Sequence, residues 1–450
     1  MTRKQITILV ALLVCLAPYL ILCLYVFPSG DDYSYAWVGA HSDNFFNTLV
    51  GEWKTWNGRY ISNILVLTNP ISQGNFGYYQ IIPLLLIGAF VAVHTATISR
   101  FSKTTIAQGV LISISILLVY LNVLPDLGEG IYWYTAAVTY FAPLIILPVH
   151  IYLLNQQVKA PRITVNIVLI LLQFLLTGFN EVLMIIMTLL HFGVAIHMKS
   201  SNKMFWLLFV TQILFSSLMY FAPGNEVRGS HFTNNHDVIH TVLNGSANTV
   251  RFSASLLLTP ALWIGTLLLL KTEFGSKSRS APTWIWIAIF FTPQLIACAG
   301  PVWTTGIIGQ HRTPNFALYC QILTIFLFLH YEKGHILVQV LKRFSTAISY
   351  PRLIIALMIS LLLIGNGRIA SNDLLSGDAQ GFHKQNLERS LKFDSLIGLQ
   401  DTLIFISELK YKPASIFIYD VTPNAKDWKN GVYVTYYNLK QHNISISCRP

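Results

Sequence analysis

The feature that most constrains this chain is a series of apolar runs, each of about the length that crosses a lipid bilayer. A transmembrane helix needs about 20 predominantly apolar residues. Runs near that length recur along the 450 residues. We predict an α-helical polytopic membrane protein of eleven spans, near 5–27, 78–98, 104–124, 134–154, 163–178, 181–197, 204–222, 252–270, 284–300, 316–331 and 352–366.

One pair of spans admits two interpretations. Residues 163–197 are a single apolar stretch interrupted by Thr177-Gly178-Phe179-Asn180-Glu181, and each half is short for a span. The stretch is either a tight hairpin of two spans or a re-entrant element. The first run, 5–27, has too long an apolar core for a cleaved signal peptide and no A-x-A site before Pro28, so it predicts a signal anchor.

The composition agrees with a membrane protein. Only 11% of the residues are charged, compared with about 25% in soluble globular proteins. This composition excludes a soluble enzyme, a disordered protein and a nucleic-acid-binding domain. The five cysteines form no CxxC pair, so we expect neither a disulfide framework nor a metal cluster.

The positions of Lys and Arg predict the orientation. With the N-terminus inside, fifteen of these cations fall in inner segments, five in outer loops and ten in the tail after residue 366. Cytoplasmic loops carry the excess of Lys and Arg in membrane proteins. The net charge of +11 therefore reflects topology, and we expect no nucleic-acid partner.

The acidic residues have the opposite distribution. Of the eleven before residue 367, only Glu273 and Glu332 lie inside, and nine lie at the outer side. The orientation rule places little demand on acids. Longer outer loops would also give this count. We favour a carboxylate-rich site at the outer face.

Three segments are predicted to lie outside the membrane. Residues 28–77 form a long aromatic outer loop, expected as amphipathic helices at the membrane surface, and 222–251 form the second long loop. After a transmembrane domain of residues 1–366, residues 367–450 are predicted as a small extracytoplasmic α/β cap. Helical spacing extends over 383–411, and 415–419 and 433–437 have the composition of strands.

The first candidate motif is Gly30-Asp31-Asp32-Tyr33, directly after the first span. Two adjacent carboxylates near a low dielectric are costly to ionise together, so one has a raised pKa and suits a general base. The alternative is an ordinary helix cap, for which Asp is favoured.

The second motif, residues 52–60, interleaves Trp53 and Trp56 with Arg59. Aromatic faces suit sugar rings, and Arg can grip a phosphate through two hydrogen bonds. An interfacial aromatic belt with Arg59 at lipid headgroups is the alternative.

Four further segments contribute candidates on the same side. Residues 125–134 mix acids with aromatics, and a carboxylate follows Asn180 inside an apolar stretch, where charge is costly and usually functional. The alternative for the latter is a wetted turn between two spans. Pro223-Gly224 supports a type II turn at the mouth of the seventh span. Sugar or acceptor binding is predicted for Glu129, Tyr132, Trp133, Asn180, Glu181, Asn225 and His311, and phosphate binding for Arg59, Arg228 and Arg312.

These motifs together carry a family resemblance. The Gly-Asp-Asp-Tyr start of the first outer loop, Trp-Asn-Gly-Arg-Tyr at 56–60, Tyr-Trp-Tyr-Thr-Ala at 132–136, Ala-Pro-Gly-Asn at 222–225 and Asp-Trp-Lys-Asn-Gly at 427–431 occur in this order. Their order and placement resemble GT-C-fold, lipid-phosphosugar-dependent glycosyltransferases. The chain is similar to a poorly characterised bacterial family grouped with the serotype-converting O-antigen glucosyltransferases.

The resemblance implies a reaction. The donor would be a polyprenyl-phosphate sugar, and an outer-loop carboxylate, Asp32 in preference to Asp31, would be the base. A hexose such as glucose would pass with inversion to a surface glycan such as O-antigen, in lipopolysaccharide biosynthesis at the outer face of the bacterial cytoplasmic membrane. Asp31-Asp32 lacks the spacer of a D-x-D motif, so neither metal nor other cofactor is expected.

Other functions remain open from sequence. A transporter or flippase of lipid-linked saccharides would place charges midway along its spans and often shows repeated halves. Here most charges lie at outer ends, and no internal repeat is found. A polymerase that joins whole repeat units and a non-enzymatic envelope assembly protein are further alternatives.

Overall fold

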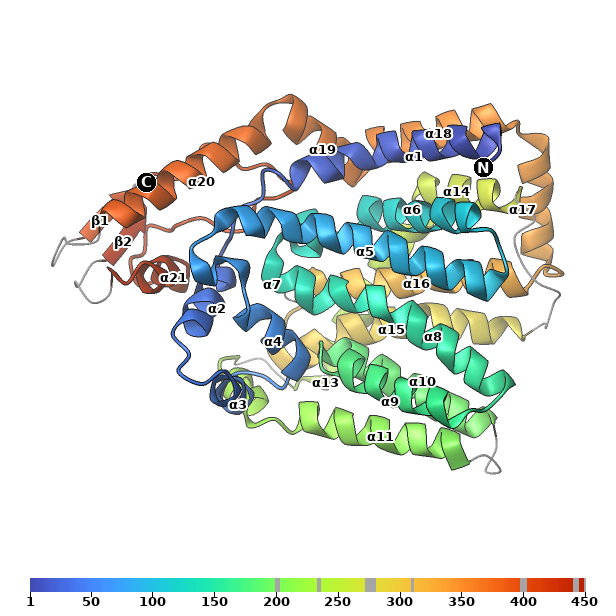
Figure 1. The fold of residues 1–450 in the computed structure, drawn as a ribbon, viewed down its shortest axis with the longest axis horizontal. Coiled ribbons are helices and arrows are strands. Elements are labelled where there is room, and N and C mark those ends of the chain that lie inside the picture. The colour runs from blue at the N-terminus through green and yellow to red at the C-terminus, as the bar shows by residue number, and fades with distance from the viewer. Residues whose placement is uncertain are drawn as a thin grey trace.

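The computed structural model is a bundle of long helices with smaller elements at its two ends (Figure 1). It describes residues 1–198, 203–232, 236–271, 281–308, 311–396, 403–439 and 445–448. The chain starts at the end of the bundle that helix α17 (Ile336–Ala347) crosses, and the C-terminal elements lie at the opposite end (Figure 1). Among the residues counted for orientation, Lys199, Glu273, Lys277, Arg279, Lys440 and Arg449 lie outside the described ranges.

All eleven predicted runs fall on helices, and seven of these have the length and apolarity of a span within the described part of the chain. Arg3–Leu22, Phe76–Ser102 and Ile106–Val123 are α1, α5 and α6. The fourth, Tyr134–Lys159, comprises α7 (Tyr134–Ala136), a π-helical turn (Ala137–Phe141) and α8 (Ala142–Lys159). The other three are α11 (Lys203–Tyr220), α15 (Thr283–Thr305) and α16 (Arg312–Tyr331).

Two of the remaining four runs lie on bent helix pairs, and counting each pair as one span raises the number of candidate spans among the described helices from seven to nine. Helices α13 (Val238–Leu257) and α14 (Pro260–Leu270) form one pair bent by 52°, and α17 with α18 (Tyr350–Leu363) forms a second bent by 107°. A proline at the start of α14 and at the second position of α18 favours a new helix there.

The ambiguous stretch 163–197 forms two helices. They are α9 (Ile163–Thr177, 15 residues) and α10 (Glu181–His197, 17 residues). At 1.5 Å per residue, 15 residues reach about 22 Å, less than the hydrocarbon thickness of about 30 Å. Both interpretations of this stretch therefore remain open.

The segment that the sequence predicts as the first outer loop is helical, as predicted. It holds α2 (Asp31–Ala40), α3 (Phe45–Thr55), α4 (Tyr60–Leu67) and a short 3-10 turn (Pro70–Gln73), gathered at one end of the bundle (Figure 1). Helix α5 follows from Asn75, whose side chain accepts hydrogen bonds from the first turn.

The second outer loop is shorter than predicted. Pro223 is the first residue of a helix, α12 (Pro223–Gly229), rather than part of a type II turn, because proline fits the first helical position. Helix α13 then begins at Val238, where the Asp237 carboxylate caps it by accepting the backbone N–H of His240 at 2.9 Å. Residues 238–251, predicted as part of the loop, therefore belong to helix α13.

The C-terminal part mixes helices with two strands. Its elements are α19 (Asn366–Leu375), α20 (Asp378–Ser395), β1 (Leu403–Ile406), α21 (Trp428–Tyr436) and β2 (Ser445–Cys448), with β1 and β2 parallel. The predicted helix over 383–411 is too long, since α20 ends at Ser395 and Leu403 opens a strand. Of the residues between, 397–402 lie outside the described ranges.

Both predicted strands in this part are wrong. Residues 415–416 lie in a turn, in which the N–H of Phe417 reaches the carbonyl of Pro413 at 2.9 Å. Most of 433–437 is helical because tertiary packing overrides strand propensity. The helical spacing of Tyr433 and Tyr436 brings both rings against Tyr33 of α2, at 4.8 and 5.1 Å between centroids.

The contact between α2 and α4 gives a stability prediction. A Cβ at Gly39 would overlap the backbone carbonyl oxygen of Leu67, whereas a Cβ at Gly51 of α3 would meet nothing within 4 Å. We expect Gly39→Ala to cost about 1–3 kcal/mol as an overpacked contact and to lower the melting temperature in detergent. Gly51→Ala, the matched control, should leave it equal or higher. Equal melting temperatures for the two variants would contradict the packing of α2 on α4.

Candidate functional site

Asp32 is a fully buried carboxylate that receives four hydrogen bonds. Thr135 donates from its hydroxyl at 2.6 Å and its N–H at 3.0 Å, the Tyr79 hydroxyl donates at 2.7 Å, and the N–H of Ser29 donates at 3.1 Å. Burial raises the pKa of Asp32 to about 6, although these donors favour the ionised form. Every oxygen lone pair is thereby occupied, so Asp32 fastens the start of α2 to α5 and α7.

Asp31 is the more available carboxylate of the pair. It is half-buried, and within the described residues its side chain accepts no hydrogen bond. Burial raises the pKa of Asp31, and the nearby guanidinium groups of Arg312 and Arg59 lower it. Of the two carboxylates, Asp31 is therefore the one with unoccupied oxygen lone pairs within the described residues, and it lies within electrostatic reach of two arginines. The choice between the two as a base stays a prediction.

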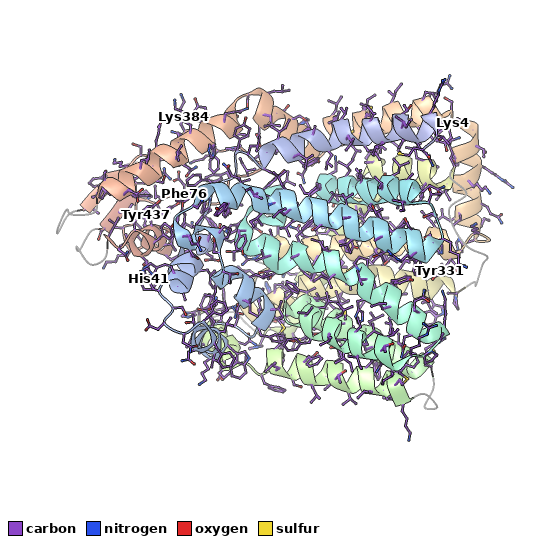
Figure 2. The ribbon with its side chains drawn as sticks, in the orientation of Figure 1. Lys4, His41, Phe76, Tyr331, Lys384 and Tyr437 are labelled. Carbon is purple, nitrogen blue, oxygen red and sulfur yellow. The ribbon has the colours of Figure 1, made fainter. Side chains whose placement is uncertain are left out.

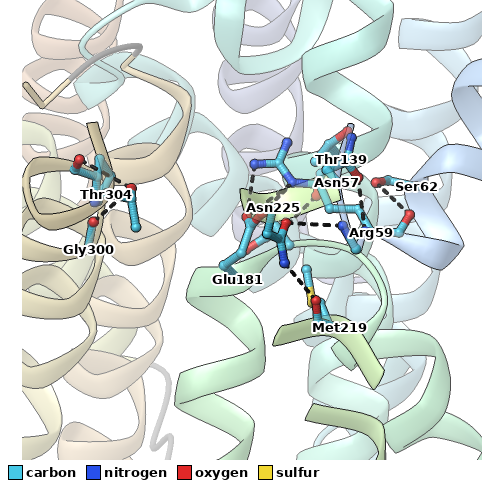
Figure 3. Close-up of polar contacts among 12 residues, drawn as sticks. Asn57, Arg59, Ser62, Thr139, Glu181, Met219, Asn225, Gly300 and Thr304 are labelled. Atoms are coloured by element: carbon cyan, nitrogen blue, oxygen red, sulfur yellow. Dashed lines mark hydrogen bonds and ion pairs between the residues drawn. The ribbon is translucent and has the colours of Figure 1, made fainter. Parts of the chain in front are cut away.

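Arg59 and Glu181 form the central ion pair of the site. The Arg59 Nε lies 3.0 Å from both Glu181 oxygens, and its Nη2 lies 2.8 Å from Oε2. The two side chains face each other in Figure 3. Asn57 holds the loop by accepting the N–H of Arg59 at 2.9 Å. The loop before α4 and the start of α10 thus meet at this pair.

The other two predicted arginines lie at the same place. The Nη1 of Arg228 is 3.8 Å from Glu181, and burial together with the neighbouring Arg59 lowers the pKa of Arg228. The guanidinium of Arg312 lies 5.0 Å from the ring centroid of Trp133 and 5.7 Å from that of Tyr140. The ring of Tyr140 also lies 5.7 Å from Arg59. We call Arg59, Arg228 and Arg312 the arginine cluster.

The arginine cluster gathers three cations around a single ion-paired carboxylate. Arg59 and Arg228 share one ion-paired carboxylate, Glu181, and Arg312 forms no ion pair within the part of the chain that the structure describes. Asp31 and Glu129 lie within electrostatic reach of Arg312. The side chains of Arg59, Arg228 and Glu181 keep 13%, 27% and 35% of their surface exposed. Like charges in one place repel, and arginine pairs well with phosphate oxygens. The cluster is therefore suited to bind an anion that arrives from outside the protein.

Glu129 borders the cluster on the side of α16. Its Oε2 accepts the backbone N–H of Arg312 at 3.2 Å, and its own N–H donates to Asp126 Oδ1 at 2.8 Å. Burial raises the pKa of Glu129, whereas Arg312 and His311 lower it. This carboxylate positions the first residue of α16, and His311 lies within its electrostatic reach.

Several predicted binding residues are fixed by internal hydrogen bonds instead. Trp53 donates to the carbonyl of Leu218, Tyr132 to that of Tyr19, and Trp133 to that of Ser29. Trp133 still faces Arg312, whereas Tyr132 is buried in the bundle. Trp56 is 42% exposed at the rim of α3.

The two asparagines also have positioning contacts. Asn180 caps α10 by accepting the N–H of Leu183 and donates to the carbonyl of Thr139. Asn225 accepts the N–H of Gly58 and donates to the carbonyl of Met219 (Figure 3). Each therefore holds a backbone segment that carries an arginine or Glu181.

Sequence reasoning missed two tyrosines of the site. Tyr35 lies one helical turn after Asp31, and its pKa is raised by burial and by the charges of Glu52 and Asp31. Its i+4 spacing from Asp31 was a usable signal. Tyr140 contacts two arginines but sits within an apolar run, so no local pattern distinguished it.

No three His, Cys, Asp or Glu side chains among the described residues lie close enough to hold a metal ion. The absence of an essential metal stays a prediction.

A search against known protein families finds none that matches this chain. A search of curated proteins finds no significant match.

The two aspartates should respond differently to the same substitution. Asp32→Asn places an amide N–H₂ among four donors, so we expect a loss of about 2–3 kcal/mol and a lower melting temperature. Asp31→Asn breaks no such bond and should melt like the unaltered protein. Thermal unfolding of the purified variants in detergent checks this, and an unchanged melting temperature for Asp32→Asn would contradict its anchoring role.

Proposed function

We propose that this protein is an inverting hexosyltransferase that uses a polyprenyl-phosphate sugar donor. Its acceptor would be a cell-surface glycan such as O-antigen. The observation that carries the proposal is the arginine cluster beside Asp31, because these are the two groups that displacement of a phosphate from a sugar requires. A cationic site stabilises the leaving phosphate, and a free carboxylate accepts the proton of the attacking hydroxyl.

The proposed step is a single displacement. An acceptor hydroxyl gives its proton to the Asp31 carboxylate while its oxygen forms a bond to the anomeric carbon of the donor. The bond from that carbon to the phosphate oxygen breaks, and polyprenyl phosphate leaves with the electron pair. The charge that grows on this oxygen is stabilised by the guanidinium groups of Arg312, Arg228 and Arg59, of which Arg59 is held by Glu181. The anomeric configuration inverts.

The surroundings of the cluster suit a sugar between base and phosphate. Trp56 offers an exposed aromatic face, and Tyr35 lies on the same helix face as Asp31. The resemblance to GT-C enzymes, the count of eleven spans and the N-inside orientation belong to the same proposal. In that orientation α2, α3 and α4 lie outside the cytoplasm, where an activated sugar must arrive on a lipid.

Loss of the proposed base should abolish transfer without loss of protein. In a strain that lacks this protein, the surface polysaccharide should decrease in mass by one hexose per repeat, and the unaltered gene should restore it. Asp31→Asn should fail to restore it, with transfer reduced about 10²–10⁴-fold in membranes given polyprenyl-phosphate glucose. Asp43→Asn, an exposed aspartate of the same outer segment, is the matched control.

A flippase or scaffold predicts another result. In that case Asp31→Asn would restore the polysaccharide as well as Asp43→Asn does, and membranes would transfer no hexose from the lipid donor. A polymerase would change the length distribution of the polysaccharide rather than the mass of its repeat. Either result would overturn the proposed hexosyl transfer.

The pH dependence of transfer should depend on Arg312. Activity needs ionised Asp31, so kcat/KM falls as the pH decreases through the Asp31 pKa, which burial raises above the ordinary aspartate range. Arg312 lowers that pKa, so Arg312→Gln should move the acid limb to higher pH. Arg228→Gln should weaken donor binding but leave the limb in place. If kcat/KM fell at the same acidic pH in the two variants, this result would contradict the role of Asp31 as the base.

A further inference from the structure

A cavity lies away from the arginine cluster, among helices of the bundle. It has a volume of about 230 Å³ and is lined by α1, α6, α14, α16 and α18. Its walls are mainly leucine and isoleucine, among them Leu111, Ile116, Leu262 and Ile322. The side chains that line an apolar void lack van der Waals contacts on the side of the void. An apolar molecule that fills the void supplies these contacts and stabilises the protein.

The dimensions of this cavity match one membrane leaflet. Along α6 its wall extends from Gln108 to Val119, eleven residue steps, which is about 16 Å at 1.5 Å per residue. The hydrocarbon core of a bilayer is about 30 Å thick. A cavity of that length that opens at a membrane surface reaches about the middle of the bilayer, which is the depth of a single lipid chain.

The mouth of the cavity is polar and cationic. Thr2, Gln5 and Gln108 line it at the start of α1 and α6. The Nζ atoms of Lys4 and Lys271 lie 5.4 and 5.2 Å from the centroid of the same ring, Tyr350. Two ammonium groups thus flank one aromatic ring above an apolar shaft. A cationic mouth above an apolar shaft complements a lipid that has an anionic headgroup and apolar chains.

The cavity and the arginine cluster lie at opposite ends of the molecule. Lys4 is at the end where the chain starts, whereas His41 of the first outer segment is at the other end (Figure 2). The donor lipid of the proposed reaction would bind beside α2 and α4. A lipid in this cavity would be a different molecule, in the opposite leaflet.

We propose that this cavity is a binding site for an anionic phospholipid of the leaflet at the N-terminal end. One acyl chain fills the shaft between α6 and α14, and the phosphate lies between Lys4 and Lys271. Basic pockets between transmembrane helices on the cytoplasmic side bind such headgroups. The bound lipid bridges α1, α14 and α18, so it holds the first span to the bent α17–α18 pair independently of any sugar transfer.

Lipid retention tests the headgroup contact. The protein is purified from membranes of equal phosphatidylglycerol and phosphatidylcholine content, and bound lipids are measured by native mass spectrometry. We expect one retained phosphatidylglycerol. The double variant Lys4→Gln with Lys271→Gln should bind it about 25-fold more weakly, since each lysine near an anionic headgroup contributes about fivefold. Lys103→Gln with Lys203→Gln, at other helix ends on that side, is the control.

A second pair of variants tests the shaft. A Cβ at Gly265, in the cavity wall, or at Gly193, outside it, meets nothing within 4 Å. Gly265→Phe should fill the shaft and displace the lipid, whereas Gly193→Phe should retain it. Phosphatidylglycerol should raise the melting temperature of Gly193→Phe but not of Gly265→Phe. The proposal is overturned if phosphatidylcholine is retained equally, or if either test variant binds like its control. Should Gly265→Phe not fold, the lysine variants decide.

Discussion

The geometry of the site depends on the hydrogen bonds that the buried carboxylate of Asp32 accepts. Asp32 takes four hydrogen bonds from residues of three segments: Ser29 before α2, Tyr79 of α5 and Thr135 of α7. Charged hydrogen bonds in a buried place are strong, and losing any one leaves a costly unpaired group. The start of α2 is therefore fixed on the bundle. The preceding residue, Asp31, is thereby held within electrostatic reach of Arg312 and Arg59.

The same principle explains the residues around the arginine cluster. Asn57, Asn180 and Asn225 bind backbone groups, and their contacts set the positions of Arg59, Glu181 and the loop that precedes Arg228. The side chains of Arg59 and Arg228 remain partly exposed. A hydrogen-bonded polar frame that holds guanidinium groups together is preorganised for an anion, since little reorganisation is needed when the anion arrives.

The two ends of the bundle offer different chemistry to the two lipids that we propose. At one end, arginines beside a free carboxylate suit a phosphate whose bond is to be broken. At the other, Lys4 and Lys271 over Tyr350 suit a phosphate that is only held, because no carboxylate or histidine lines that cavity within the described residues. The planar guanidinium of arginine can form two hydrogen bonds to the phosphate that leaves, whereas the compact ammonium of lysine suits a phosphate that is only bound.

The sequence by itself determined the positions of the apolar helices and the residue types of the site. Hydrophobic length is a local property, so all eleven runs fall on helices, and charge near an apolar run is conspicuous, so Arg59, Arg228, Arg312 and Glu181 could be singled out. The length of α9 and α10 left the number of spans open.

Only the tertiary structure decided which aspartate carboxylate is left without hydrogen bonds within the described residues, and which elements form where strands were predicted. Asp31 and Asp32 are equivalent by spacing, and their difference comes from donors 47 and 103 residues away. Tyr433 and Tyr436 have strand propensity, but packing on Tyr33 makes their segment helical. Contacts between residues far apart in the chain leave no local pattern, which is why these features could not be predicted from sequence.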